Sequence, residues 1–119
     1  MAKSSFHPLM PIERLLLKAL LLYVDNAPCY MASERNTTTL RNLITHSTPS
    51  SMDTRFAQAA RDRRLHHSCI AYDQFREKTS DKLFANILTG MAVSLSDPTL
   101  TMGELYCIAE SEDTSHENQ

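Results

Sequence analysis

The most apolar stretch of the chain runs from Ile12 to Val24, where only three charged side chains interrupt the leucines. On a helix, with 100° between successive residues, two of those charges, Arg14 and Lys18, fall into one narrow polar arc. A helix that is apolar nearly all round has to bury two faces. Pro11 suits its first turn, and Pro28 cannot continue its hydrogen bonds. The pattern therefore predicts a central helix over residues 11–26.

The rest of the chain shows weaker helical periodicity, separated by short polar breaks. Asn36 is a suitable N-cap, Ser50 or Ser51 can cap the next helix, and Thr101 with Glu104 has the spacing of a capping box. Residues 28–35 fit a short helix anchored by Tyr30 and Met31, and a break is expected at 66–68. The predicted further helices are 37–46, 52–65, 69–78, 81–95 and 102–110.

The fold class that follows is all-α, with one small domain of five or six helices packed around the Leu-rich helix at residues 11–26. Only two glycines are present in 119 residues, which disfavours the tight turns of β-sandwiches and the Gly-rich loop of a dinucleotide-binding unit. We expect residues 1–10 to form a flexible N-terminal arm, residues 11–110 the helical domain, and residues 111–119 a disordered acidic tail.

Charge is balanced overall but unevenly placed. The net charge is −2, all twelve Lys and Arg residues lie at or before Lys82, and the six acidic residues from Asp97 onward have no basic neighbour in sequence. This balance gives no global attraction to nucleic acid or to anionic membranes. The longest uninterrupted apolar run, Ala19 to Val24, is far shorter than a membrane span. With an odd number of cysteines and no cleavage-site pattern, a cytoplasmic location is expected.

The Leu-rich helix carries more apolar surface than a chain of this size easily covers. Leu17, Leu21 and Val24 form a second apolar strip beside Glu13. One interpretation is that the strip meets a partner protein or a second copy, because burying three such side chains contributes about 4 to 8 kcal/mol before association costs. The alternative is that other helices of the same chain cover it. The sequence leaves both open.

A second candidate site is the arginine cluster formed by Arg55, Arg61, Arg63 and Arg64, which is followed by two histidines. A phosphate-binding face would need these cations on one side. On a continuous helix they do not line up, because only Arg61 and Arg64 are neighbours. A solvated helix end, whose arginines favour the carbonyl dipole, is therefore the competing interpretation.

No pattern indicates catalysis, a metal or a cofactor, and the prediction is that the protein is not an enzyme. Cys29, Cys69 and Cys107 are expected to be buried small hydrophobic side chains, although sequence cannot show whether one is reactive. His66, His67 and Cys69 lack the paired fourth ligand of a structural zinc site.

In its size and its lack of motifs the chain resembles the small accessory proteins of bacterial phages and other mobile elements. That resemblance implies a non-catalytic helical protein that binds a repressor or a defence factor, here predicted as a homodimer. The alternative is a nucleic-acid-binding transcriptional regulator that uses the arginine cluster.

Overall fold

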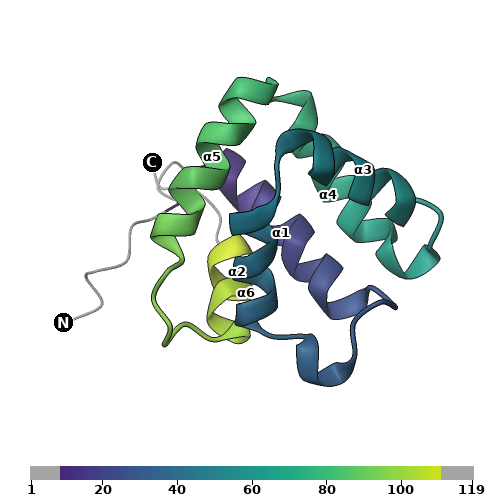
Figure 1. The fold of residues 1–119 in the computed structure, drawn as a ribbon, viewed down its shortest axis with the longest axis vertical. Helices are drawn as coiled ribbons and strands as arrows, with labels where there is room; N and C mark the ends of the chain where they lie inside the picture. The colour runs from purple at the N-terminus through teal and green to yellow at the C-terminus, as the bar shows by residue number, and fades with distance from the viewer. Residues whose placement is uncertain (1–8, 111–119) are drawn as a thin grey trace, which may run out of the picture.

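A computed structural model describes residues 9–110 of the chain, and within that range the fold is all-α, as predicted. Six α-helices are joined by short loops and two 3₁₀ turns (Figure 1). The elements are α1 (Pro11–Asn26), η2 (Ala32–Glu34), α2 (Thr37–His46), α3 (Pro49–Ala59), η3 (Arg63–Leu65), α4 (His66–Glu77), α5 (Asp81–Ser94) and α6 (Met102–Glu110).

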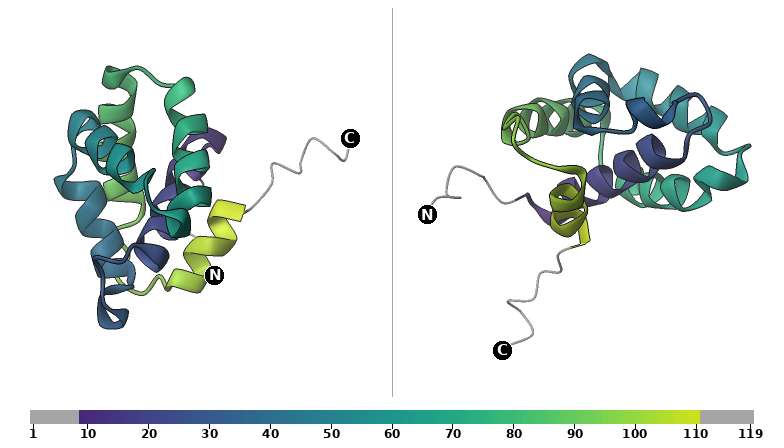
Figure 2. Two further views of the ribbon diagram at one scale, coloured as in Figure 1. Left: turned by 90° about the vertical axis from the view of Figure 1, so that its right-hand side faces the viewer. Right: turned by 90° about the horizontal axis from the view of Figure 1, so that it is seen from below.

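Helix α1 lies at the centre of the domain, which confirms the prediction from its all-round apolar pattern. It packs most extensively against α4 and then against α6, and it also contacts α2. Figure 2 shows α2 on one side of α1 and α6 on the other. Seven side chains of α1 are buried, spread over a little more than half of its circumference: Leu16, Leu17, Ala19, Leu20, Leu21, Tyr23 and Val24.

Local capping explains most helix boundaries. The Asn36 side chain accepts a hydrogen bond from the Thr39 amide at 3.1 Å. In the predicted capping box, the Glu104 amide donates to the Thr101 hydroxyl at 3.1 Å and the Thr101 amide donates to the Glu104 carboxylate at 2.9 Å. Such caps satisfy backbone groups that the helix itself leaves unpaired. Helix α1 begins at Pro11 and ends at Asn26, as its prolines indicate.

The predicted helix over 52–65 is wrong at both ends. Thr48, not Ser50 or Ser51, is the N-cap, so α3 begins at Pro49, whose fixed φ suits a first helical turn. The helix then stops at Ala59. The break expected at 66–68 lies earlier, because Ser68 is part of α4 and is buried. Its hydroxyl donates to the Ala19 carbonyl of α1 at 2.6 Å.

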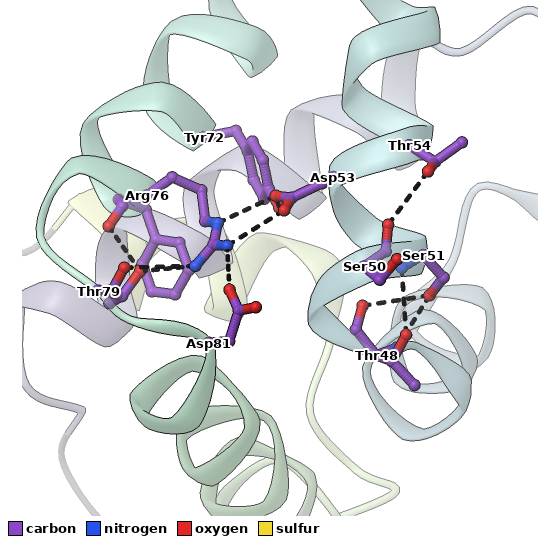
Figure 3. A network of polar contacts seen from close by, with 10 residues as sticks. Thr48, Ser50, Ser51, Asp53, Thr54, Tyr72, Arg76, Thr79 and Asp81 are labelled. Carbon is purple, nitrogen blue, oxygen red and sulfur yellow. Dashed lines mark hydrogen bonds and ion pairs between the residues drawn. The ribbon is translucent and has the colours of Figure 1, made fainter.

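A polar network ties α3, α4 and the start of α5 together (Figure 3). The Arg76 guanidinium donates from Nε and Nη2 to the two carboxylate oxygens of Asp53, at 3.0 and 3.1 Å, and from Nη2 to Asp81 at 2.6 Å. The Tyr72 hydroxyl donates to Asp53 as well. A bidentate arginine–carboxylate pair fixes orientation as well as distance, so this network sets how the three helices meet.

Other expectations need correction at particular residues. Leu9 is buried and its carbonyl accepts a hydrogen bond from Arg14, so the packed region begins before residue 11. The rest of the expected arm, residues 1–8, and the expected tail, residues 111–119, lie outside the described range. Met31 does not anchor its turn, since 71% of it is exposed. Over residues 9–110, no helix is long and apolar enough to cross a membrane.

Candidate functional site

The chain turns sharply between α3 and α4, and this turn builds an exposed polar surface. Asp62 organises it: one of its oxygens accepts from the Arg64 amide at 2.9 Å and from Arg64 Nε at 3.1 Å, and the other accepts from Arg64 Nη2 at 3.1 Å. Leu65 is buried and holds the turn against the core. We call the exposed surface of this turn, made of Arg61, Arg63, His66, His67 and Ile70, the basic corner.

The basic corner surrounds an open depression of about 570 Å³. Its polar side comes from the arginines and histidines, with the two histidine rings edge to face at 5.3 Å between centroids. Its apolar side includes Ile70, which is 42% exposed. Cys69 and Asp73 line the same depression. The corner therefore offers cations next to an apolar side chain in a concave surface.

The arginines of the turn between α3 and α4 are not equally free to bind a partner. Arg64 is paired with Asp62, and the hydrogen bonds from Arg64 lower the pKa of that carboxyl. Arg61 and Arg63 form no ion pair within residues 9–110. Two guanidinium groups are thus available to an anionic partner.

Of the four predicted arginines, the structure brings Arg61, Arg63 and Arg64 together and leaves Arg55 apart. They converge because α3 ends at Ala59 and the chain reverses, so the predicted continuous helix over 52–65 does not form. Arg55 lies earlier on α3, where its Nη1 donates to the Tyr23 hydroxyl at 3.3 Å.

The expected partner interface at Leu17, Leu21 and Val24 is corrected by the structure. All three side chains have no exposed surface and belong to the core of this single chain. The alternative interpretation, that other helices cover the strip, therefore applies. The physical reason is that α1 has neighbours on several sides, so its second apolar face is already occupied.

The three cysteines also differ from the expectation of buried thiols. Cys29 and Cys107 are exposed, and Cys69 is partly buried. Burial, with a smaller contribution from the Asp73 carboxylate, raises the pKa of the Cys69 thiol. A thiol whose pKa is raised is a poor nucleophile near neutral pH. In the part of the chain that the structure describes, no group of three or more His, Cys, Asp or Glu residues could hold a metal ion.

Sequence reasoning missed Ile70 as a surface residue. The buried residues of α4 are Ser68, Ala71, Tyr72 and Phe75, which follow a helical period. Ile70 falls outside that stripe. An apolar residue outside the buried stripe of a helix indicates an exposed apolar side chain, but this can be recognised only once the helix is known to begin at His66.

The fold and the corner together define a small all-helical domain with a basic, partly apolar surface at one turn. Comparison of the chain with protein-family models, with curated proteins and with solved structures gave no match.

Proposed function

We propose that this is a non-catalytic, cytoplasmic binding protein that docks the basic corner onto an acidic surface of a partner protein. The observation that carries the proposal is Ile70, exposed inside a depression and flanked by Arg61 and Arg63, neither of which has a carboxylate partner within residues 9–110. Arginine is enriched at protein interfaces, and energetic hot spots commonly combine it with a desolvated apolar contact.

The partner is expected to differ from this chain. Two copies meeting through the same corner would bring like charges together, which is unfavourable. A repressor or a defence factor, the targets implied by the resemblance to phage accessory proteins, is the kind of partner we propose. The homodimer predicted from the sequence would have to use another surface, and sedimentation at several protein concentrations tests it.

The test compares two double variants with the unmodified protein. Arg61→Glu with Ile70→Asp reverses one charge and removes the apolar contact. Lys82→Glu with Leu83→Asp makes the same changes on the exposed face of α5, where Leu83 is 43% exposed, close to the 42% of Ile70. Circular dichroism establishes that each variant is folded. Tagged proteins are then used to capture partners from a nuclease-treated bacterial lysate, which are identified by mass spectrometry.

We expect one stoichiometric protein to be captured by the unmodified protein and by the α5 control, and to be lost with the corner variant. Equal capture by the corner variant would contradict the proposal, as would the lack of any stoichiometric partner.

A nucleic-acid-binding regulator is the second candidate, because the turn brings Arg61, Arg63 and Arg64 onto one surface. Each neutralised phosphate contributes a slope of about −0.9 to the dependence of log affinity on log salt, so three contacts give a slope of about −2.7. Titration of labelled duplex DNA at several salt concentrations measures it. No retention of DNA at about 50 mM salt eliminates this candidate.

A further inference from the structure

Arg55 has a buried hydrogen-bond donor without an acceptor. In the described part of the chain, its Nε is the one buried side-chain nitrogen or oxygen atom without a hydrogen-bond partner. Other partly buried arginines donate to strong acceptors: Arg76 to two carboxylates, and Arg35 to the backbone carbonyls of Ala27 and Tyr30 just after α1. Buried polar groups are normally paired, and an exception in a native fold calls for an explanation.

The contacts that Arg55 does make are weak. Nη1 donates to the neutral Tyr23 hydroxyl at 3.3 Å, which is long for a hydrogen bond. The guanidinium carbon lies 5.6 Å from the centroid of the Tyr23 ring. The opposite edge of the guanidinium, formed by Nε and Nη2, has no acceptor within residues 9–110. This is the edge with which arginine binds two oxygens of a carboxylate or a phosphate at once.

Space is available beside Arg55. It lines a cavity of about 170 Å³ together with Tyr23, Cys29 and Gln58. A water molecule takes about 30 Å³ in the liquid, so an anion of the size of phosphate fits. On another side, Arg55 lines an open depression of about 330 Å³ that also includes His46. Arg55 therefore borders open space on two sides, while its Nε itself is buried.

Arg55 is the one cationic side chain in the lining of this cavity. Asp62 is the one carboxylate in its lining, and both of its oxygens already accept hydrogen bonds from Arg64. The Arg55 charge is thus not neutralised by the residues that line the cavity. The Gln58 amide and the Cys29 thiol add neutral polar groups at the wall.

We propose that this Arg55 cavity is an oxyanion-binding site that takes a phosphate or carboxylate group. A small rotation of the side chain toward the cavity would let Nε and Nη2 donate to two oxygens of the ligand. The site goes beyond the proposed function, because it uses none of the residues of the basic corner.

The test is a nuclear magnetic resonance titration of the full chain with inorganic phosphate and, separately, with acetate, each compared with sodium chloride at equal ionic strength. The Arg55 Nε–Hε resonance and the backbone amide of Gln58 report binding. Arg55→Gln removes the Nε and Nη2 donor edge, and Arg41→Gln is the matched control because it removes a partly exposed arginine of α2 that lines neither this cavity nor the adjacent depression.

We expect saturable shifts with at least one anion, weakened about tenfold or more in Arg55→Gln and unchanged in Arg41→Gln. Saturation by phosphate alone assigns a phosphoryl ligand, and saturation by acetate assigns a carboxylate. Linear shifts with both anions, or equal binding by Arg55→Gln, would overturn the proposal. Should Arg55→Gln fail to fold, the Arg55 Nε–Hε resonance of the unmodified protein still decides the question, since this resonance must move and saturate.

Discussion

Replacing Leu17 by alanine distinguishes a core residue from an interface residue. The Leu17 side chain has no exposed surface, so the substitution removes its buried methyl groups and leaves a cavity among the neighbours of α1. Fully buried Leu→Ala changes destabilise by about 3 to 5 kcal/mol, with the larger values where the site cannot collapse. A domain of this size has a total stability of about 5 to 15 kcal/mol. The variant is therefore expected to fold, with a loss of about 3 to 4 kcal/mol.

Urea unfolding followed by far-ultraviolet circular dichroism, at two protein concentrations, measures this loss. Leu83→Ala is the matched control, because Leu83 is 43% exposed and its truncation is expected to change stability by less than about 1 kcal/mol. If Leu17 belonged to a dimer interface instead, the unfolding midpoint of the unmodified protein would rise with concentration. A loss below about 1 kcal/mol in Leu17→Ala, together with such a rise, would refute the placement of Leu17 in the core.

Three further predictions concern polar contacts, and each is measured by urea unfolding against the unmodified protein. Arg35→Ala removes hydrogen bonds to carbonyls in the last turn of α1 and in the segment that follows it. It is expected to destabilise by about 2 to 3 kcal/mol, since those acceptors lose their partner; a loss below about 0.5 kcal/mol would contradict this role. Thr101→Ala removes the cap of α6 and should lower stability by about 1 kcal/mol, whereas an unchanged midpoint would show that the cap is dispensable. Burial, and then the hydrogen bond to Asp53, raises the pKa of Tyr72 above its ordinary value of 10.0. The stability that this neutral hydroxyl contributes is complete below about pH 10 and declines as the pH rises further, because the unfolded state ionises first. The stability advantage of the unmodified protein over Tyr72→Phe should therefore shrink above pH 10, and a constant difference would contradict the assignment.

The features that sequence predicted well are those set by local chemistry. The limits of α1 follow from Pro11 and Pro28, which act on the adjacent backbone wherever the helix is placed. The caps at Asn36 and Thr101 likewise depend on residues no more than three positions away. The fold class could be predicted in the same way, because helical periodicity and the scarcity of glycine can be read from the sequence without knowing which helices pack together.

The features that sequence did not predict depend on contacts between distant segments. Nothing near Leu17 shows whether a partner or another helix of the same chain covers it, because that depends on how many helices reach α1. Ser68 is a similar case. The serine was expected to lie in a break between helices, but its hydroxyl donates a hydrogen bond to the Ala19 carbonyl, 49 positions away in the sequence. Burial of a polar residue is tolerated only when such a partner exists, and the partner is a property of the fold.

The arginines show why the candidate sites could be located only with the structure. The same cationic group has different partners in different places. Arg76 joins α3, α4 and the start of α5 through Asp53 and Asp81, whereas Arg64 closes a local turn through Asp62. In both cases a carboxylate of the same chain neutralises the guanidinium. Arg55 is half-buried beside a cavity with only a neutral hydroxyl as acceptor, and an uncompensated cation in that position reduces stability unless a ligand supplies the anion. No carboxylate within residues 9–110 forms an ion pair with Arg55, and this unneutralised charge is the reason to look for an anion at Arg55.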